Sequence, residues 1–158
     1  MSGGCIAIDW GTTNRRAYRL GADGAVTDSA SDDSGVLAMK ADDYPRDIAA
    51  YRARWGALPV IAVGMVGSTR GWREAPYVSA PAGLADLAAA CLRLADDVVI
   101  VPGVAVTGAR HDVMRGEEVQ ALGAVAAGLV PADALLAQGR DALVDDGLVG
   151  ARRAEAEG

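Results

Sequence analysis

Short apolar runs that end directly in glycine-containing turns recur along this chain. Three such runs, each with the turn that follows it, are residues 5–9 with Trp10-Gly11-Thr12-Thr13-Asn14, residues 58–63 with Gly64-Met65-Val66-Gly67-Ser68, and residues 97–101 with Pro102-Gly103. Runs rich in Val and Ile that are bounded by Gly or Pro are typical of strands, and runs without polar alternation are typical of strands buried on both faces. The pattern predicts a sheet whose strands end in loops, as in α/β domains.

Two further strands are expected close to the first one. Residues 16–20 alternate between apolar and polar side chains, Gly21-Ala22-Asp23-Gly24 forms a turn, and residues 25–30 can form the next strand. The chain therefore opens with a predicted antiparallel meander of three strands.

Helices are expected between the later strands. Ile48, Tyr51 and Trp55 recur at helical spacing within residues 44–55, and Pro45 suits a first helical turn. Residues 82–95 are rich in Leu and Ala, and residues 117–127 are followed by Gly128 and Pro131. Residues 132–138 favour a short helical turn.

The resulting order is three strands, then a helix, strand, helix, strand and helix, with right-handed crossovers. This is the order of a single ribonuclease-H-like lobe of the α/β class. We expect a mixed five-stranded sheet, three strands antiparallel and then two parallel, with helices on both faces. The lobe is assigned to residues 1–138, and residues 139–158 are expected to form an irregular, charged and loosely packed tail, in which residues 144–149 resemble a small hairpin.

Length and charge exclude several classes of protein. The 158 residues suit one domain that buries roughly two thirds of its unfolded surface. The net charge of −6 comes without a basic block, so we expect neither a nucleic-acid partner nor an anionic membrane partner. No apolar run approaches the roughly 20 residues of a spanning helix, and no cationic segment precedes an apolar one at the start. We expect a cytoplasmic protein.

Metal-thiolate and histidine chemistry are also disfavoured. Cys5 and Cys91 lie far apart, each within an apolar stretch, and are expected to be buried free thiols. His111 is the single histidine, which excludes a site built on several imidazoles and makes a His-based triad improbable. Chemistry here must use carboxylates, hydroxyls, Arg and backbone amides.

The first turn carries the most informative chemistry. Gly11 lets backbone amides approach an anion, the Thr12 and Thr13 hydroxyls add donors beside Asn14, and Asp9 can hold Mg²⁺ through water. An ordinary hairpin turn, with Asp and Thr capping local amides, is the alternative interpretation. The strand, turn and strand order favours phosphate binding.

These residues resemble a known superfamily. D-W-G-T-T-N followed by Arg15-Arg16-Ala17 is similar to the first phosphate motif of the actin, hexokinase and heat-shock ATPase superfamily. Residues 64–78, G-M-V-G-S-T-R-G-W-R-E-A-P-Y-V, and residues 112–120, D-V-M-R-G-E-E-V-Q, resemble two characteristic stretches of 2-dehydro-3-deoxygalactonokinases. The resemblance implies ATP and Mg²⁺ as cofactors, a sugar-acid substrate, and phosphorylation of 2-dehydro-3-deoxy-galactonate on its terminal hydroxyl.

Both stretches follow expected strands, so they should line one cleft beyond the carboxyl ends of those strands. Ser68 and Arg70 can hydrogen-bond a sugar acid, since Arg offers a planar fork that suits a carboxylate. Trp72 and Tyr77 can form an apolar wall. Core packing of the two aromatic rings, and a solvated Arg70, are the alternatives.

Four charged residues cluster at the start of the third helix: Asp112, Arg115, Glu117 and Glu118. Helix capping alone can explain one of the carboxylates. The resemblance implies that a carboxylate here is the general base, with Glu117 as first choice and Asp112 as the alternative. Arg115 suits the acid group or the transferred phosphate, although an ion pair with Glu118 accounts for it equally well.

The resemblance covers residues 5–136 and then departs from the family, because Ala137-Gln138-Gly139-Arg140 stands where a Pro-Gly-Thr-His type of phosphate loop is expected. The second lobe of the superfamily is not among these residues, so we expect an inactive lobe on its own. A fragment, an internal deletion and a split kinase are three explanations.

Two other functions compete with the kinase. A non-catalytic sugar-acid-binding or interaction module is the main alternative, and a Mg-dependent phosphatase is disfavoured because Trp10 and Gly11 replace its usual second acid. An exposed apolar cleft wall predicts self-association or a covering partner lobe.

Overall fold

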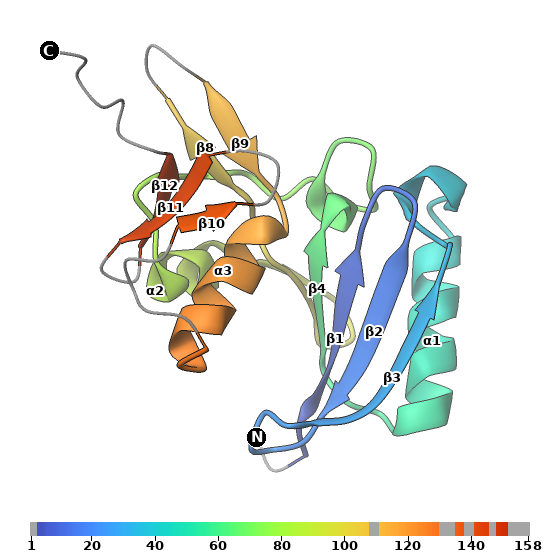
Figure 1. Ribbon diagram of the computed structural model, residues 1–158. Helices are drawn as coiled ribbons and strands as arrows, with labels where there is room; N and C mark the ends of the chain where they lie inside the picture. The colour runs from blue at the N-terminus through green and yellow to red at the C-terminus, as the bar shows by residue number, and fades with distance from the viewer. Residues whose placement is uncertain (1–2, 108–110, 130–134, 138–140, 146–147, 152–158) are drawn as a thin grey trace, which may run out of the picture.

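A computed structural model describes residues 3–107, 111–129, 135–137, 141–145 and 148–151. Its main sheet has six strands in the order β3-β2-β1-β4-β7-β6 (Figure 1). These strands are β1 (Cys5–Trp10), β2 (Arg15–Leu20), β3 (Val26–Asp32), β4 (Val60–Gly64), β6 (Leu92–Leu94) and β7 (Val98–Ile100). Three α-helices, α1 (Asp43–Trp55), α2 (Leu84–Ala90) and α3 (Glu117–Ala126), and two 3-10 helices, η1 (Val36–Ala38) and η2 (Met65–Gly67), accompany it.

The strand directions confirm the predicted mixed sheet. Strands β1, β2 and β3 pair antiparallel, with Ala7 opposite Tyr18 and Tyr18 opposite Ser29. Strand β4 pairs parallel with β1, and β7 pairs parallel with β4. The three parallel strands bring their carboxyl ends to one edge of the sheet, where ligands of open α/β sheets bind.

The predicted helix over residues 82–95 is too long. Helix α2 ends at Ala90, and residues 92–94 instead form β6, a sixth strand antiparallel to β7. Asp96 and Asp97 both have positive φ, 59° and 53°, which closes a tight turn between the two strands. Leu92 and Leu94 pack against the main core from this strand. Long-range packing therefore overrides the helix propensity of leucine.

One face of the sheet is covered by α1. Tyr44, Ile48, Tyr51 and Trp55 form the buried stripe of this helix, spaced four, three and four residues apart. They join a core that contains the inward side chains of β1, including Ile6, Ile8 and Trp10, all fully buried. Alternate residues of β1 therefore supply this face, as a strand with a period of two requires.

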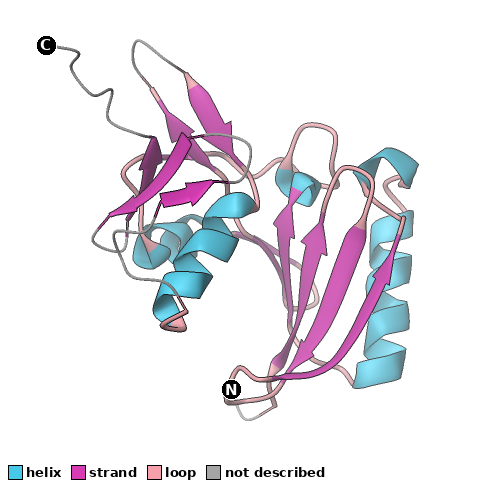
Figure 2. Ribbon diagram, in the orientation of Figure 1, coloured by secondary structure: helices cyan, strands magenta, loops and turns pink. Residues whose placement is uncertain are grey.

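Helices α2 and α3 lie on the other face of the sheet (Figure 2). Leu87 from α2 and Leu122 from α3 are buried in a second core, and Ile61 and Val63 of β4 pack against it. The prediction of helices on both faces is thus confirmed.

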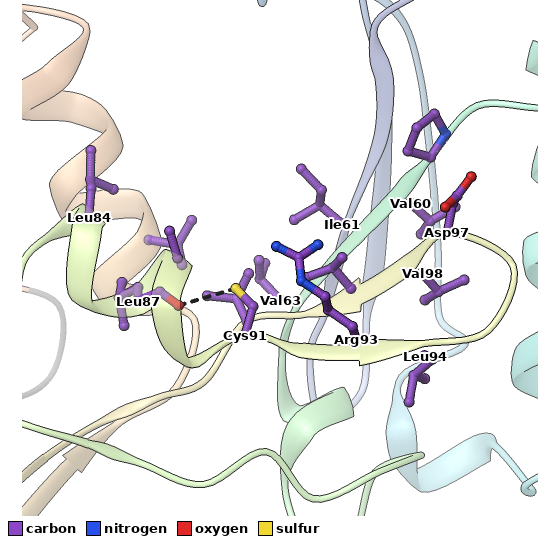
Figure 3. Close-up of a pocket in the computed structure, with 15 residues that line it drawn as sticks. Val60, Ile61, Val63, Leu84, Leu87, Cys91, Arg93, Leu94, Asp97 and Val98 are labelled. Carbon is purple, nitrogen blue, oxygen red and sulfur yellow. Dashed lines mark hydrogen bonds between the residues drawn. The ribbon is translucent and has the colours of Figure 1, made fainter. Parts of the chain in front are cut away.

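An apolar groove of about 540 Å³ lies between this face of the sheet and the two helices. Ile61, Val63 and Leu87 line it, and Cys91 donates a hydrogen bond from its thiol to the Leu87 carbonyl at the groove wall (Figure 3). The thiols of Cys5 and Cys91 are free and half-buried, and burial raises the pKa of each.

Two small sheets complete the described chain. One contains β5 (Val78–Ser79), β8 (Val104–Val106) and β9 (Asp112–Met114); the other contains β10 (Leu135–Ala137), β11 (Asp141–Asp145) and β12 (Leu148–Ala151). The expected helical turn over residues 132–138 is wrong for 135–137, which form a strand, while 132–134 and 138 lie outside the described residues. Val144 pairs with Val149, as the predicted hairpin requires.

The segment expected to be irregular therefore contains two strands, because β11 pairs with both β10 and β12. The domain boundary at residue 138 stays a prediction. Among the described residues, no helix has the length and apolar character needed to cross a membrane.

Candidate functional site

Asp9 is placed at the sheet edge by the register of β1. It lies opposite Val63 of the parallel strand β4 and opposite Arg16 of the antiparallel strand β2. Residues directly opposite each other share a face of the sheet, so Arg16 and Asp9 point to the same side. That side is the one away from α1, since the neighbouring Ile8 and Trp10 face the α1 core.

The first turn, residues 10–14, has its carbonyl groups tied to the chain that follows β3. The amides of Gly35, Val36 and Leu37 donate to the carbonyls of Thr13, Gly11 and Thr12, respectively. Gly35 has no side chain to prevent this contact, since a Cβ there would lie 2.4 Å from the Thr12 carbonyl oxygen. Residues 35–37 therefore hold the turn in place through its carbonyl groups.

The amides of this turn are left open. Within the described residues, the N–H groups of Thr12, Thr13 and Asn14 donate no hydrogen bond to another residue, and all three side chains are exposed. Successive open backbone N–H groups form an anion-binding concavity. The geometry fits the predicted phosphate turn.

Two glycines allow α3 to approach this edge. Gly64, at the end of β4, has a φ of 88°, and a Cβ there would lie 2.9 Å from the Trp10 carbonyl oxygen. Gly116, just before α3, has a φ of 111°, and a Cβ there would lie 3.2 Å from the Gly64 Cα. Both positions require glycine, because other residues strain at such φ and would collide.

The approach brings α3 side chains to Asp9. Gln120 Nε2 donates to Asp9 Oδ2 at 3.5 Å. Burial raises the pKa of Asp9, and the nearby charge of Glu117 raises it further, while Arg16 and Gln120 act in the opposite direction. The structure therefore brings Asp9 and Glu117, two of the predicted catalytic residues, to one site.

The donor set suits Mg²⁺ held through water. Among the described residues there is no cluster of three or more His, Cys, Asp or Glu that can hold a metal directly. Mg²⁺ is usually bound by one or two carboxylates together with waters and substrate phosphates. A half-buried Asp9 with Glu117 nearby and open turn amides fits that mode of binding.

The loop of residues 65–77, which follows β4, is folded back on itself. Ser68 is buried, donates from its hydroxyl to the Met65 carbonyl at 2.7 Å and accepts from the Arg70 amide. Trp72 stacks on Tyr44 with ring centroids 5.6 Å apart and packs against the α1 core. Both side chains thus have internal partners, and the Arg70 side chain is exposed.

Arg115 lies between this loop and α3. It is 8% exposed, and its Nη2 donates to the Ala75 carbonyl at 2.9 Å. Its guanidinium carbon lies 4.2 Å from the centre of the Tyr77 ring, and Nε donates to the Tyr77 hydroxyl at 3.4 Å. Tyr77 is 43% exposed, so part of its side chain remains open to solvent.

Asp112, the other predicted candidate for the general base, lies away from the start of α3. Asp112 begins β9, where it pairs with Val106 at the end of the strand remote from α3. Its Oδ1 accepts from the Val113 amide. The structure therefore brings Glu117, rather than Asp112, next to Asp9.

Two residues of the site, Gln120 and Arg16, were not singled out from the sequence, whereas Glu118 was named as part of the charged cluster. Gln120 lies one turn after Glu117 on α3, a spacing that could have indicated a shared face. Arg16 stands opposite Asp9 once the meander register is known. Glu118 is 1% exposed, accepts from the Gly116 amide at 2.7 Å, and has a pKa raised mainly by burial.

Comparison with known proteins places the chain in the class of carbohydrate kinases. Residues 9–143 match the family model described as 2-keto-3-deoxy-galactonokinase. A probable 2-dehydro-3-deoxygalactonokinase of Rhizobium meliloti (strain 1021) is 39% identical over 76% of this chain and 42% of its own length. The 2-dehydro-3-deoxygalactonokinase of Escherichia coli (strain K12) is 37% identical over 78% of this chain and 43% of its own length.

A solved structure has the same fold. The crystal structure of a protein assigned as a 2-dehydro-3-deoxygalactonokinase from Sinorhizobium meliloti aligns with a TM-score of 0.77 and 34% identity, covering 92% of this chain and 52% of that one. The chain belongs to the 2-keto-3-deoxy-galactonokinase family, as the sequence motifs predicted. It spans less than half the length of the two curated relatives.

Proposed function

We propose that this chain is the lobe of an ATP-dependent 2-dehydro-3-deoxygalactonokinase that holds the phosphates and the sugar acid. The reaction is transfer of the γ-phosphoryl group of ATP to the 6-hydroxyl of 2-dehydro-3-deoxy-D-galactonate. The observation that carries the proposal is the contact of Gln120 with Asp9, which brings α3 to the end of β1, directly before the turn with the open amides of residues 12–14.

The turn supplies the phosphate contacts in this proposal. Thr12, Thr13 and Asn14 present open amides, and the two threonines add hydroxyls, to the terminal phosphates of ATP, while the Gly11 amide closes the turn by donating to the Asn14 carbonyl. Asp9 orients Mg²⁺ through water. The ion supplies charge neutralisation, and phosphoryl transfer otherwise depends on positioning more than on covalent help.

The 65–77 loop holds the sugar acid in this proposal, and Arg115 lies beneath that loop. Arg70 is the proposed partner of the acid group, because its side chain is exposed on this loop. Tyr77 is partly exposed and offers an apolar wall, whereas Ser68 and Trp72 support the loop from within. Arg115, the fifth residue expected to bind the sugar acid, lies beneath the Tyr77 ring and supports it.

Glu117 is the proposed general base. It is exposed at the first turn of α3, close enough to Asp9 to influence the pKa of that carboxyl. A base must reach the hydroxyl proton of a substrate whose phosphate partner lies at the turn. Asp112 is the alternative base, but its place at the far end of β9 favours Glu117.

Calorimetry and a kinase assay test this function on the chain itself. We expect 2-dehydro-3-deoxygalactonate to bind, and Mg-ATP to bind in a manner that Asp9→Ala abolishes. Asp23→Ala is the matched control, because Asp23 is an exposed aspartate in the β2–β3 turn, at the opposite end of these strands. Sugar-acid binding without Mg-ATP binding or phosphate transfer would indicate the non-catalytic module instead.

The remaining partner proposals follow from the same function. A cytoplasmic setting suits an enzyme that uses ATP, and neither nucleic acid nor membrane is a proposed partner. Association through the apolar groove, with a second copy or with another kinase lobe, stays a prediction that gel filtration checks.

A further inference from the structure

We infer that Arg115 is a positioning residue that fixes the sugar-acid loop, residues 65–77, against the start of α3. This inference rests on the proposed function for its meaning, since the loop and Glu117 are the proposed substrate-binding and base elements. It assigns Arg115 a role exercised through other residues rather than through contact with the substrate.

The backbone of Arg115 is joined to the proposed base. Its amide donates to Glu117 Oε2 at 3.0 Å, and Gly116, which follows it, begins the turn into α3. Any shift of Arg115 therefore moves the carboxylate of Glu117 as well.

The side chain of Arg115 is joined to the loop. Nη2 donates to the Ala75 carbonyl, the guanidinium lies over the Tyr77 ring, and Nε donates to the Tyr77 hydroxyl. These partners stand 40 and 38 positions earlier in the chain. One planar group thus makes contacts in two directions, which the point charge of a lysine cannot reproduce.

The guanidinium is directed inward. Nη1 is buried without a hydrogen-bond partner among the described residues, and a Cβ on Gly67 would lie 2.7 Å from it. The absent side chain of Gly67 leaves the space that Nη1 fills. A substrate carboxylate has no access to this nitrogen while the loop is in place.

Burial of the charge couples the two elements. Glu118, itself buried at the start of α3, is a carboxylate whose pKa the charge of Arg115 helps to lower, against the larger effect of burial. An arginine that is this buried is favoured only while its loop contacts and its acidic neighbour are present. Opening of the 65–77 loop therefore exposes the guanidinium or leaves it buried without its partners.

Hydrogen exchange and sugar-acid calorimetry test the inference together. The variants are Arg115→Lys, which keeps the charge, and Gly67→Ala, which keeps Arg115 and places a methyl group 2.7 Å from Nη1 and 3.0 Å from Ile100 Cγ2. Arg73→Lys is the control, because Arg73 is an exposed arginine of the same loop whose side chain, within the described residues, donates its hydrogen bond to the carbonyl of Trp72 beside it.

We expect both variants to speed exchange of the Trp72 and Ala75 amides at least tenfold, because these amides are held by carbonyls of the same loop. Exchange in β1 and α1 should stay as in the wild type. Affinity for 2-dehydro-3-deoxygalactonate should fall about tenfold in both variants, and the double variant should lose little more than either single one. Arg73→Lys should change neither quantity.

Three results would overturn the inference. Unchanged protection of Trp72 and Ala75 in both variants would show that Arg115 does not hold the loop. Loss of protection across β1 and α1 in both variants, Gly67→Ala included, would show that the contact stabilises the whole fold and does not position the loop alone. Full sugar-acid affinity in Arg115→Lys with a loosened loop would show that the position of the loop is irrelevant to binding. A wild-type chain that binds no sugar acid, while the exchange result holds, would overturn the proposed function and leave the contact between loop and helix supported.

Discussion

Gln120 Nε2 lies 3.5 Å from Asp9 Oδ2, although 111 positions separate the two residues in the chain. The contact joins the second turn of α3 to the end of β1. Glu117, one turn earlier on the same face of α3, adds a negative charge that helps to raise the pKa of Asp9 after burial has raised it. A carboxylate in this environment gains more from a cation than an exposed one does.

Replacement of Asp9 by Asn should separate stability from function. Burial raises the pKa of Asp9 above its ordinary value of 3.8, so the folded state holds the proton more tightly than the unfolded state. The stability from that proton is present at low pH and is lost as the pH rises through the raised pKa. At pH 7, Asp9→Asn should therefore raise the free energy of unfolding, by at most about 1 kcal/mol because solvent screens this half-buried group.

The same variant should no longer bind Mg-ATP, because an amide is a poor ligand for the hydrated ion. Thermal unfolding with and without Mg-ATP measures both effects in one series. A variant more than about 1 kcal/mol less stable than the wild type would contradict the assigned cause of the pKa shift.

Glu118 should make stability fall as the pH rises above its ordinary pKa of 4.5, because burial raises the pKa of this carboxyl in the folded state. Glu118→Gln removes the titration, and its side-chain oxygen can still accept from the Gly116 amide. We expect it to cost less than about 1 kcal/mol at pH 7 and to flatten the pH dependence. Glu118→Ala, which leaves that amide unpaired and opens a cavity, should cost about 2–3 kcal/mol.

Urea denaturation of the wild type and both variants at pH 5 and pH 8 checks this prediction. If Glu118→Gln kept the full pH dependence of the wild type, the titrating group would have to be another carboxyl, such as Asp9.

Strands β1, β4 and β7 were predictable because apolar runs with Val or Ile that end in Gly or Pro turns report local geometry, and β2 and β3 because of apolar and polar alternation around the turn of residues 21–24. Strand β6 was not, because Leu92 and Leu94 suit a helix and become a strand only through pairing with β7. The turn between β6 and β7 requires positive φ at Asp96 and Asp97, and nothing in the sequence indicates that these two aspartates adopt that conformation.

The site divides in the same way. The proximity of Asp9 and Glu117 was expected from the rule that loops after parallel strands share one edge, although the structure reaches Glu117 through β9, an antiparallel strand of a separate sheet. The inward direction of Arg115 and the contact of Gln120 depend on how closely α3 approaches β4. That distance is set by two glycines on different elements, Gly64 and Gly116, and becomes visible only in three dimensions.

Arg15 is a buried charge outside the candidate site, and the stability of the fold should depend strongly on it. It is 6% exposed, lies between the rings of Trp10 and Tyr51, and pairs with Asp32 and Asp47 at 2.6 Å each. Removing one member of a buried ion pair leaves the others uncompensated. Arg15→Met should therefore lower the free energy of unfolding by about 3 kcal/mol in urea denaturation.

The acid side of this network has the opposite pH dependence to Glu118. Burial alone would raise the pKa of Asp32, but hydrogen bonds from Arg15 and the Ser34 amide outweigh it and leave the pKa lowered from 3.8. The contribution of Asp32 to the free energy of unfolding is fully present above pH 3.8 and is lost as the pH falls through the lowered pKa. Arg15→Met should remove this acid-sensitive part. Arg54→Ala, which breaks an exposed ion pair with Asp28, should leave unfolding unchanged and serves as control.

Gly116 and Gly123 should respond in opposite directions to the same substitution. Gly116 has a φ of 111°, and a Cβ there would lie 3.2 Å from Gly64 Cα, so Gly116→Ala should cost about 1–3 kcal/mol and weaken phosphate binding by displacing α3 from Asp9. Gly123 lies within α3 with nothing within 4 Å of an added Cβ, so Gly123→Ala should stabilise by about 0.8 kcal/mol. Urea denaturation measures both changes, and Mg-ATP calorimetry should show a loss only in Gly116→Ala. Equal phosphate affinity in the two variants would mean that the approach of α3 to β4 does not shape the site.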